Sequence, residues 1–193
     1  MIPRMIVVAG PGGSGKSTLY PVSSFGVAFF NADDRAAELN GGSYGSISNE
    51  IRKIVNHEFE AFVLGSIEKR NSCAIETTLR SDATFEQARI AKQAGFVTEM
   101  RYLALRDFAS HLDRVKARAD AGGHSASETT LRRIYEASLR NLRRAVLEMD
   151  LLWVYDNTSI DASHPLVLEA RKGEVCFVAD DAPNWLTAFL GLS

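Results

Sequence analysis

Residues 10–17 read Gly-Pro-Gly-Gly-Ser-Gly-Lys-Ser, which matches the spacing G-x-x-x-x-G-K-[ST] of a phosphate-binding loop, the P-loop. A short β-branched run, residues 5–9, precedes the loop, and the chain from Lys16 to Pro21 can form a helix. Glycines allow the loop to bend so that successive backbone N–H groups face one concavity, and the helix N-terminus adds partial positive charge. A plain Gly-rich turn would leave Lys16 and Ser17 unexplained. The segment therefore predicts a polyphosphate site.

The polar residues of the loop have expected parts in binding ATP with Mg²⁺. Lys16, which is also a candidate catalytic residue, is expected to reach the β- and γ-phosphate oxygens. Ser17 is the expected metal ligand because its hydroxyl can bind Mg²⁺, and Thr18 is expected near the α-phosphate. The predicted nucleotide-binding residues of this segment are Gly10, Pro11, Gly12, Gly13, Ser14, Gly15, Lys16, Ser17 and Thr18.

Other segments must separate the classes of P-loop protein, since kinases, GTPases, transporters and motors all carry the loop. The sequence has no Asn-Lys-x-Asp segment, which would read guanine. Its one Asp-x-x-Gly, residues 120–123, follows a predicted helix rather than a strand. These features count against a GTPase, and the chain also lacks a Leu-Ser-Gly-Gly signature.

Composition favours one soluble domain. The 193 residues are 46% apolar, enough for one sizeable core, so residues 1–193 are predicted to form a single domain. A net charge of −2 gives no general attraction to nucleic acid or to an anionic membrane. The first apolar run is too short for a signal peptide, and no 18 apolar residues run together. We expect a cytoplasmic protein without nucleic-acid or membrane partners. Cys73 and Cys176 lie among apolar residues and are both expected in the core.

Alternating strand and helix patterns predict an α/β fold. After residues 5–9, residues 27–31 are expected to form a second buried strand, residues 73–77 and 97–105 further strands, and residues 151–155 the last core strand. Helices are expected over residues 47–67 and 82–94, the second ending at Gly95; the first has an apolar face of Ile51, Ile54, Val55, Phe62 and Val63. Residues 166–170 and 174–179 resemble a hairpin. The pattern predicts a P-loop NTPase, a three-layer α/β/α fold with a central, mostly parallel sheet and a C-terminal β-hairpin.

A helical lid region is predicted around residues 106–133. Arg114 and Arg118 lie four residues apart on one face of its first helix, beside an apolar stripe. They could close over ATP and neutralise the transferring phosphoryl group, which makes them candidate catalytic residues; the alternative is a solvated charged face. A Gly-Gly pair at residues 122–123 breaks this helix. Ser125 and Glu128 have the spacing of a capping box that opens the next helix.

Polar residues follow three predicted strands, at the carboxyl ends where doubly wound sheets bind ligands. Asp33 is the candidate base that accepts the proton of an acceptor hydroxyl; alternatively, Asp33 or Asp34 caps the following helix. Glu76 could hold Mg²⁺ through water or hydrogen-bond the acceptor, and Arg80 could bind an acceptor phosphate. Either residue could instead belong to a structural ion pair. The predicted acceptor-binding residues are Asp33, Glu76, Thr77 and Arg80.

Eight segments, which together span most of the chain, resemble segments of the zeta toxin-like P-loop kinases. The matching pieces are AGPGGSGKST (9–18), FNAD (30–33), IETTLR (75–80), RVKAR (114–118), GGH (122–124), RRIY (132–135), SLRNL (138–142) and YDNT (155–158). The resemblance implies a nucleotide-kinase-like fold that uses ATP and Mg²⁺. It also implies that Lys16 is a phosphate ligand, that Asp33 is the base, and that lid arginines lie near Arg114 and Arg118.

The best-known members of this family phosphorylate a hydroxyl of UDP-N-acetylglucosamine and are held inactive by a small antitoxin. The resemblance thus implies a small-molecule acceptor such as a nucleotide sugar, and an antitoxin as a protein partner. Residues 122–124 are either a hinge of the lid, with His124, Arg132 or Arg133 meeting phosphate, or a plain helix-breaking turn. Asn157, after the last parallel strand, is a candidate adenine contact or part of an Asx-turn.

Two functions from different classes remain open on the sequence. The first is an ATP-dependent kinase that phosphorylates a hydroxyl of a small molecule, and the polar residues at the strand ends favour it. The second is an ATP-dependent switch or regulatory protein, in which the nucleotide orders a loop that engages a protein partner.

Overall fold

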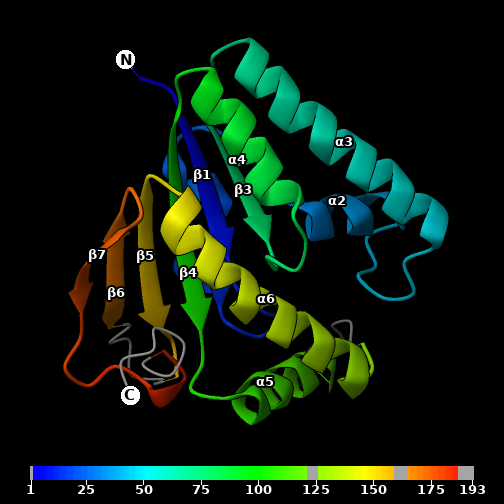
Figure 1. The fold of residues 1–193 in the computed structure, drawn as a ribbon. Coiled ribbons are helices and arrows are strands. Elements are labelled where there is room, and N and C mark those ends of the chain that lie inside the picture. Colours follow the sequence, from blue (N-terminus) through cyan, green and yellow to red (C-terminus); the bar gives the residue numbers. More distant parts are fainter. Residues whose placement is uncertain (1, 121–125, 159–164, 187–193) are drawn as a thin grey trace.

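A seven-stranded sheet organises the computed structural model, which describes residues 2–120, 126–158 and 165–186 (Figure 1). The strand order is β2-β3-β1-β4-β5-β6-β7. Strands β1 to β5 are parallel, and β6 and β7 extend the sheet as an antiparallel hairpin. The predicted fold class is confirmed. The strands are β1 Arg4–Ala9, β2 Ala28–Phe30, β3 Cys73–Thr77, β4 Val97–Ala104, β5 Leu151–Asp156, β6 Leu166–Arg171 and β7 Glu174–Val178.

Short polar side chains determine where several helices begin. Asn31 caps α2, Ser48 caps α3 and Ser127 caps α6, and each accepts a hydrogen bond from a backbone N–H of the first turn. The predicted cap Ser125 is therefore wrong, because the Ser127 hydroxyl occupies that position; Ser125 itself lies outside the described residues. Gly95, at φ 82°, follows α4 as predicted. The helices are α1 Lys16–Leu19, the 3₁₀ helix η1 Val22–Phe25, α2 Ala32–Leu39, α3 Asn49–Glu68, α4 Ala83–Gln93, α5 Phe108–Asp120 and α6 Glu128–Glu148.

Helices cover both faces of the sheet, which gives three layers. Successive side chains of a strand point to opposite faces. In β1, Met5 and Val7 are fully buried in a core shared with α3, α4 and α6, the helices in front of the sheet in Figure 1. Ile6 and Val8 belong to a smaller cluster on the other face, under α1 and η1. The strand that leads into the P-loop is thus buried on both faces, so the loop starts from a rigid position.

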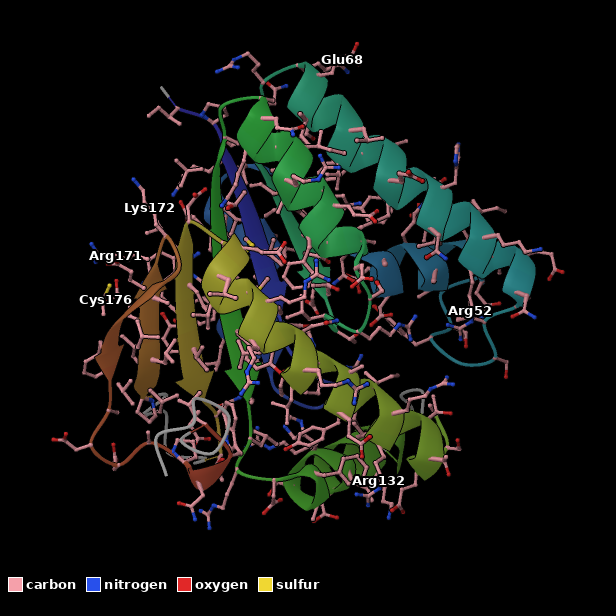
Figure 2. All side chains as sticks on the ribbon, in the orientation of Figure 1. Arg52, Glu68, Arg132, Arg171, Lys172 and Cys176 are labelled. Atoms are coloured by element: carbon pink, nitrogen blue, oxygen red, sulfur yellow. The ribbon has the colours of Figure 1, made fainter. Side chains whose placement is uncertain are left out.

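Three apolar residues that were expected to be buried are exposed, and two of them lie on edge strands. Phe29 in β2 is 47% exposed, because β2 ends the sheet and has a neighbour on one side only. Cys176 lies at the other edge, on β7 (Figure 2), whereas Cys73 in β3 is buried as predicted. Ile54 is 47% exposed, because α3 buries the adjacent stripe that contains Val55, Val63 and Ile67.

None of the helices in the described residues combines the length and hydropathy that a membrane span requires.

Candidate active site

A cleft of ≈ 1450 Å³ opens at the carboxyl ends of β1, β2 and β3. The P-loop and the segments after β2 and β3 meet there, α3 and α4 contribute one wall, and α5 contributes two arginines. Gly10, Pro11 and Ser14 belong to the loop but do not line the cleft. The predicted site residues that line it are Gly12, Gly13, Gly15, Lys16, Ser17, Thr18, Asp33, Glu76, Thr77, Arg80, Arg114, Arg118 and Asn157.

Two glycines fix the path of the P-loop. Gly10 has a φ of +140°, and a Cβ there would lie 2.1 Å from the carbonyl oxygen of Leu103 in β4. Gly15 has a φ of +88°, and a Cβ there would lie 2.1 Å from Nδ2 of Asn157. Any side chain at these positions would combine an unfavourable backbone conformation with a steric clash. The loop can therefore approach its neighbours this closely only with glycine.

Lys16 lies across the P-loop and is only 7% exposed. Its Nζ donates to the carbonyl oxygens of Gly10 (2.9 Å) and Pro11 (3.2 Å) and lies 3.8 Å from the Glu76 carboxylate. Burial lowers the pKa of Lys16, and the nearby carboxylates of Glu76 and Asp33 oppose that shift. An ammonium group in such a desolvated position interacts more strongly with phosphate than it would in water.

Ser17 and Glu76 bring a hydroxyl and a carboxylate together, and oxygen atoms of this kind suit a hard cation such as Mg²⁺. The Ser17 hydroxyl donates to a Glu76 carboxylate oxygen at 3.2 Å. Within the described residues there is no group of three or more His, Cys, Asp or Glu side chains that could hold a metal ion. Mg²⁺ commonly binds through one or two protein oxygens, substrate phosphates and waters, and the residues present fit that mode.

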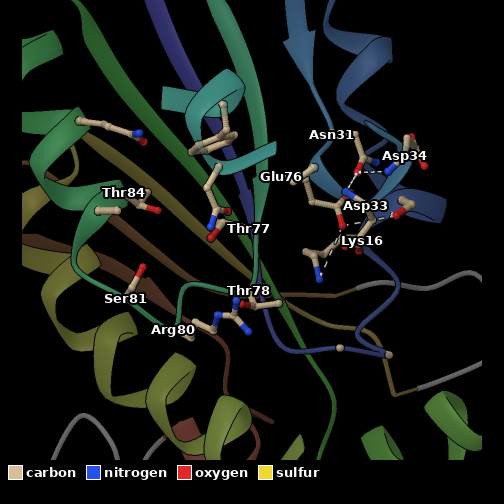
Figure 3. A pocket seen from close by; sticks show the side chains of 18 of the residues that line it. Lys16, Asn31, Asp33, Asp34, Glu76, Thr77, Thr78, Arg80, Ser81 and Thr84 are labelled. Atoms are coloured by element: carbon tan, nitrogen blue, oxygen red, sulfur yellow. Dashed lines mark hydrogen bonds and ion pairs between the residues drawn. The ribbon is translucent and has the colours of Figure 1, made fainter. Parts of the chain in front are cut away.

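Asp33 lies in the first turn of α2, beside Lys16 (Figure 3). The alternative that Asp33 or Asp34 caps this helix is wrong, because the side chain of Asn31 accepts from the backbone N–H groups of both residues, at 3.0 and 3.3 Å. Asp34 instead accepts a hydrogen bond from the Tyr44 hydroxyl at 2.9 Å, which raises the pKa of Tyr44. The cap leaves the Asp33 carboxylate on the cleft side, within electrostatic reach of Lys16.

The segment after β3 presents Arg80 to the cleft from a strained turn (Figure 3). Leu79 has a φ of +55°, which is unusual for a bulky residue, yet its side chain is fully buried. The Thr77 hydroxyl accepts from the Leu79 N–H at 3.0 Å, and Asn141 of α6 donates to the Leu79 carbonyl at 2.9 Å. Strain of this kind persists where surrounding contacts fix the backbone, and it is frequent at functional sites. No pattern in the sequence indicated this contact of Asn141.

Arg114 and Arg118 of α5 both line the cleft. Arg114 donates to the carbonyl oxygen of Thr158 at 3.2 Å, which ties the helix to the segment after β5. Arg132 lies elsewhere: it pairs with Glu128 at 3.5 Å and its guanidinium lies 4.1 Å from the ring centroid of Phe108. Arg133 is exposed on α6 and does not line the cleft. The predicted hinge at residues 122–124, with His124, lies outside the described residues.

Asn157 and His111 fix the P-loop through its backbone carbonyl oxygens. Asn157 is 6% exposed and its Nδ2 donates to the Ser14 carbonyl oxygen at 2.8 Å. The Asx-turn considered for Asn157 is made by Asp156, whose Oδ1 accepts from the Thr158 N–H at 2.8 Å. His111, in α5, is 2% exposed, and its Nδ1 lies 3.1 Å from the Gly12 carbonyl oxygen. No sequence signal distinguished it from an exposed histidine.

The comparisons with known proteins concern the fold of the chain. No protein-family profile matches the chain. An uncharacterized protein of Haemophilus influenzae is 26% identical over 135 residues, which cover 68% of this chain and 92% of that protein. A solved structure from the PezAT chromosomal toxin–antitoxin system of Streptococcus pneumoniae is similar with a TM-score of 0.64 and 15% identity, over 98% of this chain and 85% of that one.

The AvrRxo1-ORF1:-ORF2 complex with ATP contains another similar chain, with a TM-score of 0.67 and 14% identity. The match covers 92% of this chain and 60% of that one, so the present chain spans less than two thirds of its length. At these identities the likeness concerns the fold. The chain therefore shares the fold of these proteins, which is the fold that the resemblance to zeta toxin-like P-loop kinases implied.

Proposed function

We propose that this protein transfers the γ-phosphoryl group of ATP to a hydroxyl group of a small molecule, with Mg²⁺ as its metal. The observation that carries the proposal is the convergence of Lys16, the Ser17 and Glu76 pair, and Asp33 in one cleft. A phosphate ligand, oxygens for Mg²⁺ and a base for the acceptor are the parts that phosphoryl transfer requires. The kinase fold of the similar structures supports the same reaction class.

Each of these residues has a defined part in the proposed reaction. The P-loop amides and Lys16 bind the β- and γ-phosphates. Ser17 and Glu76 would hold Mg²⁺, which would supply positive charge to offset the charge that develops as the γ-phosphoryl group leaves. The acceptor oxygen bonds to the γ-phosphorus, the bond from that phosphorus to the bridging oxygen of ADP breaks, and Asp33 takes the hydroxyl proton. Arg114 and Arg118 offset the charge on the transferring group from the side of α5.

The acceptor that we propose is an anionic compound of nucleotide-sugar size. The cleft exceeds the roughly 300–1,000 Å³ of ordinary small-molecule sites, so it has room for ATP and a second substrate. Arg52 of α3 and Arg80 after β3 line the cleft, and a guanidinium group matches a phosphate in geometry and charge. UDP-N-acetylglucosamine, the acceptor of the best-known zeta toxins, is the first compound to test.

An antitoxin-like protein partner is proposed on a separate ground. One similar structure comes from a chromosomal toxin–antitoxin system, and the other is a complex of two gene products, ORF1 and ORF2. A partner of this kind would lower turnover by blocking access to the cleft.

The test is to incubate the protein with ATP, magnesium chloride and a panel of nucleotide sugars, nucleosides and cell extract. Mass spectrometry should detect the gain of one phosphoryl group on a small molecule and the matching formation of ADP. Lys16→Ala should abolish the transfer. An ATP-dependent protein complex without any phosphorylated product would instead favour the switch function.

Asp33→Asn tests the base directly. The change preserves the shape of the side chain and leaves the Asn31 cap intact, because Asn31 bonds to the backbone of residue 33. We expect kcat to fall by about 10²–10⁴-fold, with ATP affinity little changed. Asp180→Asn, at an exposed carboxylate beyond β7, is the matched control. Full turnover in Asp33→Asn would refute the assignment of the base.

A further inference from the structure

His111 connects three elements that meet beside the phosphate loop. It lies in the first turn of α5, and its side chain is 2% exposed. Nε2 accepts a hydrogen bond from the backbone N–H of Leu105, just after β4, at 3.0 Å. Nδ1 lies 3.1 Å from the carbonyl oxygen of Gly12 in the P-loop. The imidazole ring therefore links the sheet, the lid helix and the loop.

The two partners of the ring determine its tautomer. A backbone N–H can only donate, so Nε2 must be the unprotonated nitrogen. A carbonyl oxygen can only accept, so Nδ1 must carry the proton. The neutral Nδ1–H form satisfies both bonds at once, while the charged ring would set an N–H on Nε2 against the N–H of Leu105.

The hydrogen bond to Gly12 also orients the next amide of the loop. The carbonyl of Gly12 and the N–H of Gly13 belong to one planar trans peptide, so they point in opposite directions. Because His111 holds the carbonyl on the side of α5, the Gly13 N–H is directed to the opposite side. Asn157 acts in the same way two peptides further on, where it holds the Ser14 carbonyl and thereby directs the N–H of Gly15. The loop binds phosphate through such amides.

The surroundings of His111 keep the ring neutral. Burial is the main cause that lowers its pKa to about 4, and the nearby positive charges of Lys16 and Arg114 act in the same direction. The hydrogen bond to Gly12 and the carboxylate of Asp107 oppose the shift. From α6, the ring of Tyr135 packs against the imidazole at 5.1 Å between centroids. At neutral pH the tautomer that both bonds require is thus the favoured one.

We propose that His111 is a positioning residue for nucleotide binding: its Nδ1–H holds the Gly12 carbonyl so that the P-loop amides face the phosphates. The inference rests on the proposed function, since it assumes that the loop binds ATP. It assigns no contact between His111 and substrate. The start of α5 also packs closely against the loop, because a Cβ added to Gly13 would lie 2.8 Å from the His111 carbonyl oxygen.

Three variants separate the two hydrogen bonds. His111→Asn places an amide nitrogen where Nδ1 was, so it can keep the bond to Gly12. His111→Gln extends its amide to the position of Nε2, so it can keep only the bond to Leu105, and His111→Ala keeps neither. Exposed His57 of α3 provides a matched control, His57→Asn.

Calorimetric titration with ATP and magnesium chloride is the measurement. We expect His111→Asn to bind within about threefold of wild type, and the Gln and Ala variants to bind about tenfold more weakly or worse. A merely structural role would lower the melting temperature of the Asn and Gln variants alike and would not separate their ATP affinities. Equal ATP affinity in these two variants would therefore overturn the inference.

Nitrogen NMR of the wild-type imidazole provides a test that does not depend on any variant folding. At pH 7 we expect a proton on Nδ1 and none on Nε2. A proton on Nε2 would overturn the inference even if ATP binds. If folded wild-type protein does not bind ATP, the proposed function is refuted. The NMR result tests only the tautomer of His111 and does not test the proposed function.

Discussion

Replacing Gly15 by alanine should damage the P-loop in a way whose size follows from the structure. Gly15 has a φ of +88°, and an added Cβ would lie 2.1 Å from Nδ2 of Asn157. The left-handed conformation costs an alanine about 1–2 kcal/mol. To relieve the clash Asn157 must move and give up its buried hydrogen bond to the Ser14 carbonyl, which costs about 1–3 kcal/mol more. We therefore expect Gly15→Ala to lower the free energy of unfolding by about 2–5 kcal/mol.

Gly26→Ala is the control for the free-energy cost of the left-handed backbone conformation. Gly26 has a φ of +65°, but nothing lies within 4 Å of a Cβ added there. Its cost should be limited to the left-handed conformation, about 1–2 kcal/mol. Urea denaturation of both variants, analysed by linear extrapolation, measures the two losses. ATP binding should be lost in Gly15→Ala and retained in Gly26→Ala, because only Gly15 belongs to the loop.

The double variant Gly15→Ala/Asn157→Ala isolates the clash itself. Removing the Asn157 amide makes room for the new methyl group, so the double variant should be more stable than the sum of the two single losses predicts, by about 1–3 kcal/mol. The account would be refuted if Gly15→Ala lost no more stability than Gly26→Ala, or if the two substitutions at the loop were simply additive.

Three further predictions concern the site. Glu76→Gln removes the negative charge that faces Ser17. In calorimetry, the resulting loss of ATP affinity should be about tenfold larger with magnesium present than with EDTA present. An equal loss of affinity in both conditions would contradict a role near the metal. Arg118→Ala should lower kcat by about 10²–10³-fold, whereas the exposed Arg140→Ala should not, and equal rates would contradict the lid role. Because the pKa of His111 is about 4 in the folded protein and 6.5 when unfolded, the unfolded chain binds more protons between these values. The free energy of unfolding should thus fall as the pH drops from about 6.5 to 4, by about 3 kcal/mol; a fall of the same size in His111→Asn would contradict this.

The sequence was most informative where a local rule and the fold agree. The P-loop spacing, the β-branched strand before it and Gly95 at the end of α4 each depend on neighbouring residues, and the structure has all three. The position of Asp33 after β2 followed from the rule that parallel strands bring their carboxyl ends together. The sequence also favoured Asp33 over Asp34, but it gave no sign of the Asn31 cap or of the hydrogen bond from Tyr44 to Asp34.

Contacts between distant segments were the part that the sequence could not reveal. Cys176 sits among apolar residues, and only the strand order shows that β7 is an edge. Asn141 reaches Leu79 across 62 positions, and Asn157 reaches Ser14 across 143. Hydrogen bonds of this kind leave no periodic pattern in the sequence. Each depends on how one element packs in the folded protein against a loop that is distant in sequence.

The central claim is that the P-loop at residues 10–17 binds the phosphates of ATP through its amides and Lys16. Calorimetric titration of folded protein with ATP and magnesium chloride tests it most directly. The account predicts saturable binding at one site per chain and a large loss of affinity in Lys16→Ala. Folded wild-type protein that gives no binding heat at any temperature tested, and no ATP-dependent rise in melting temperature, would contradict it.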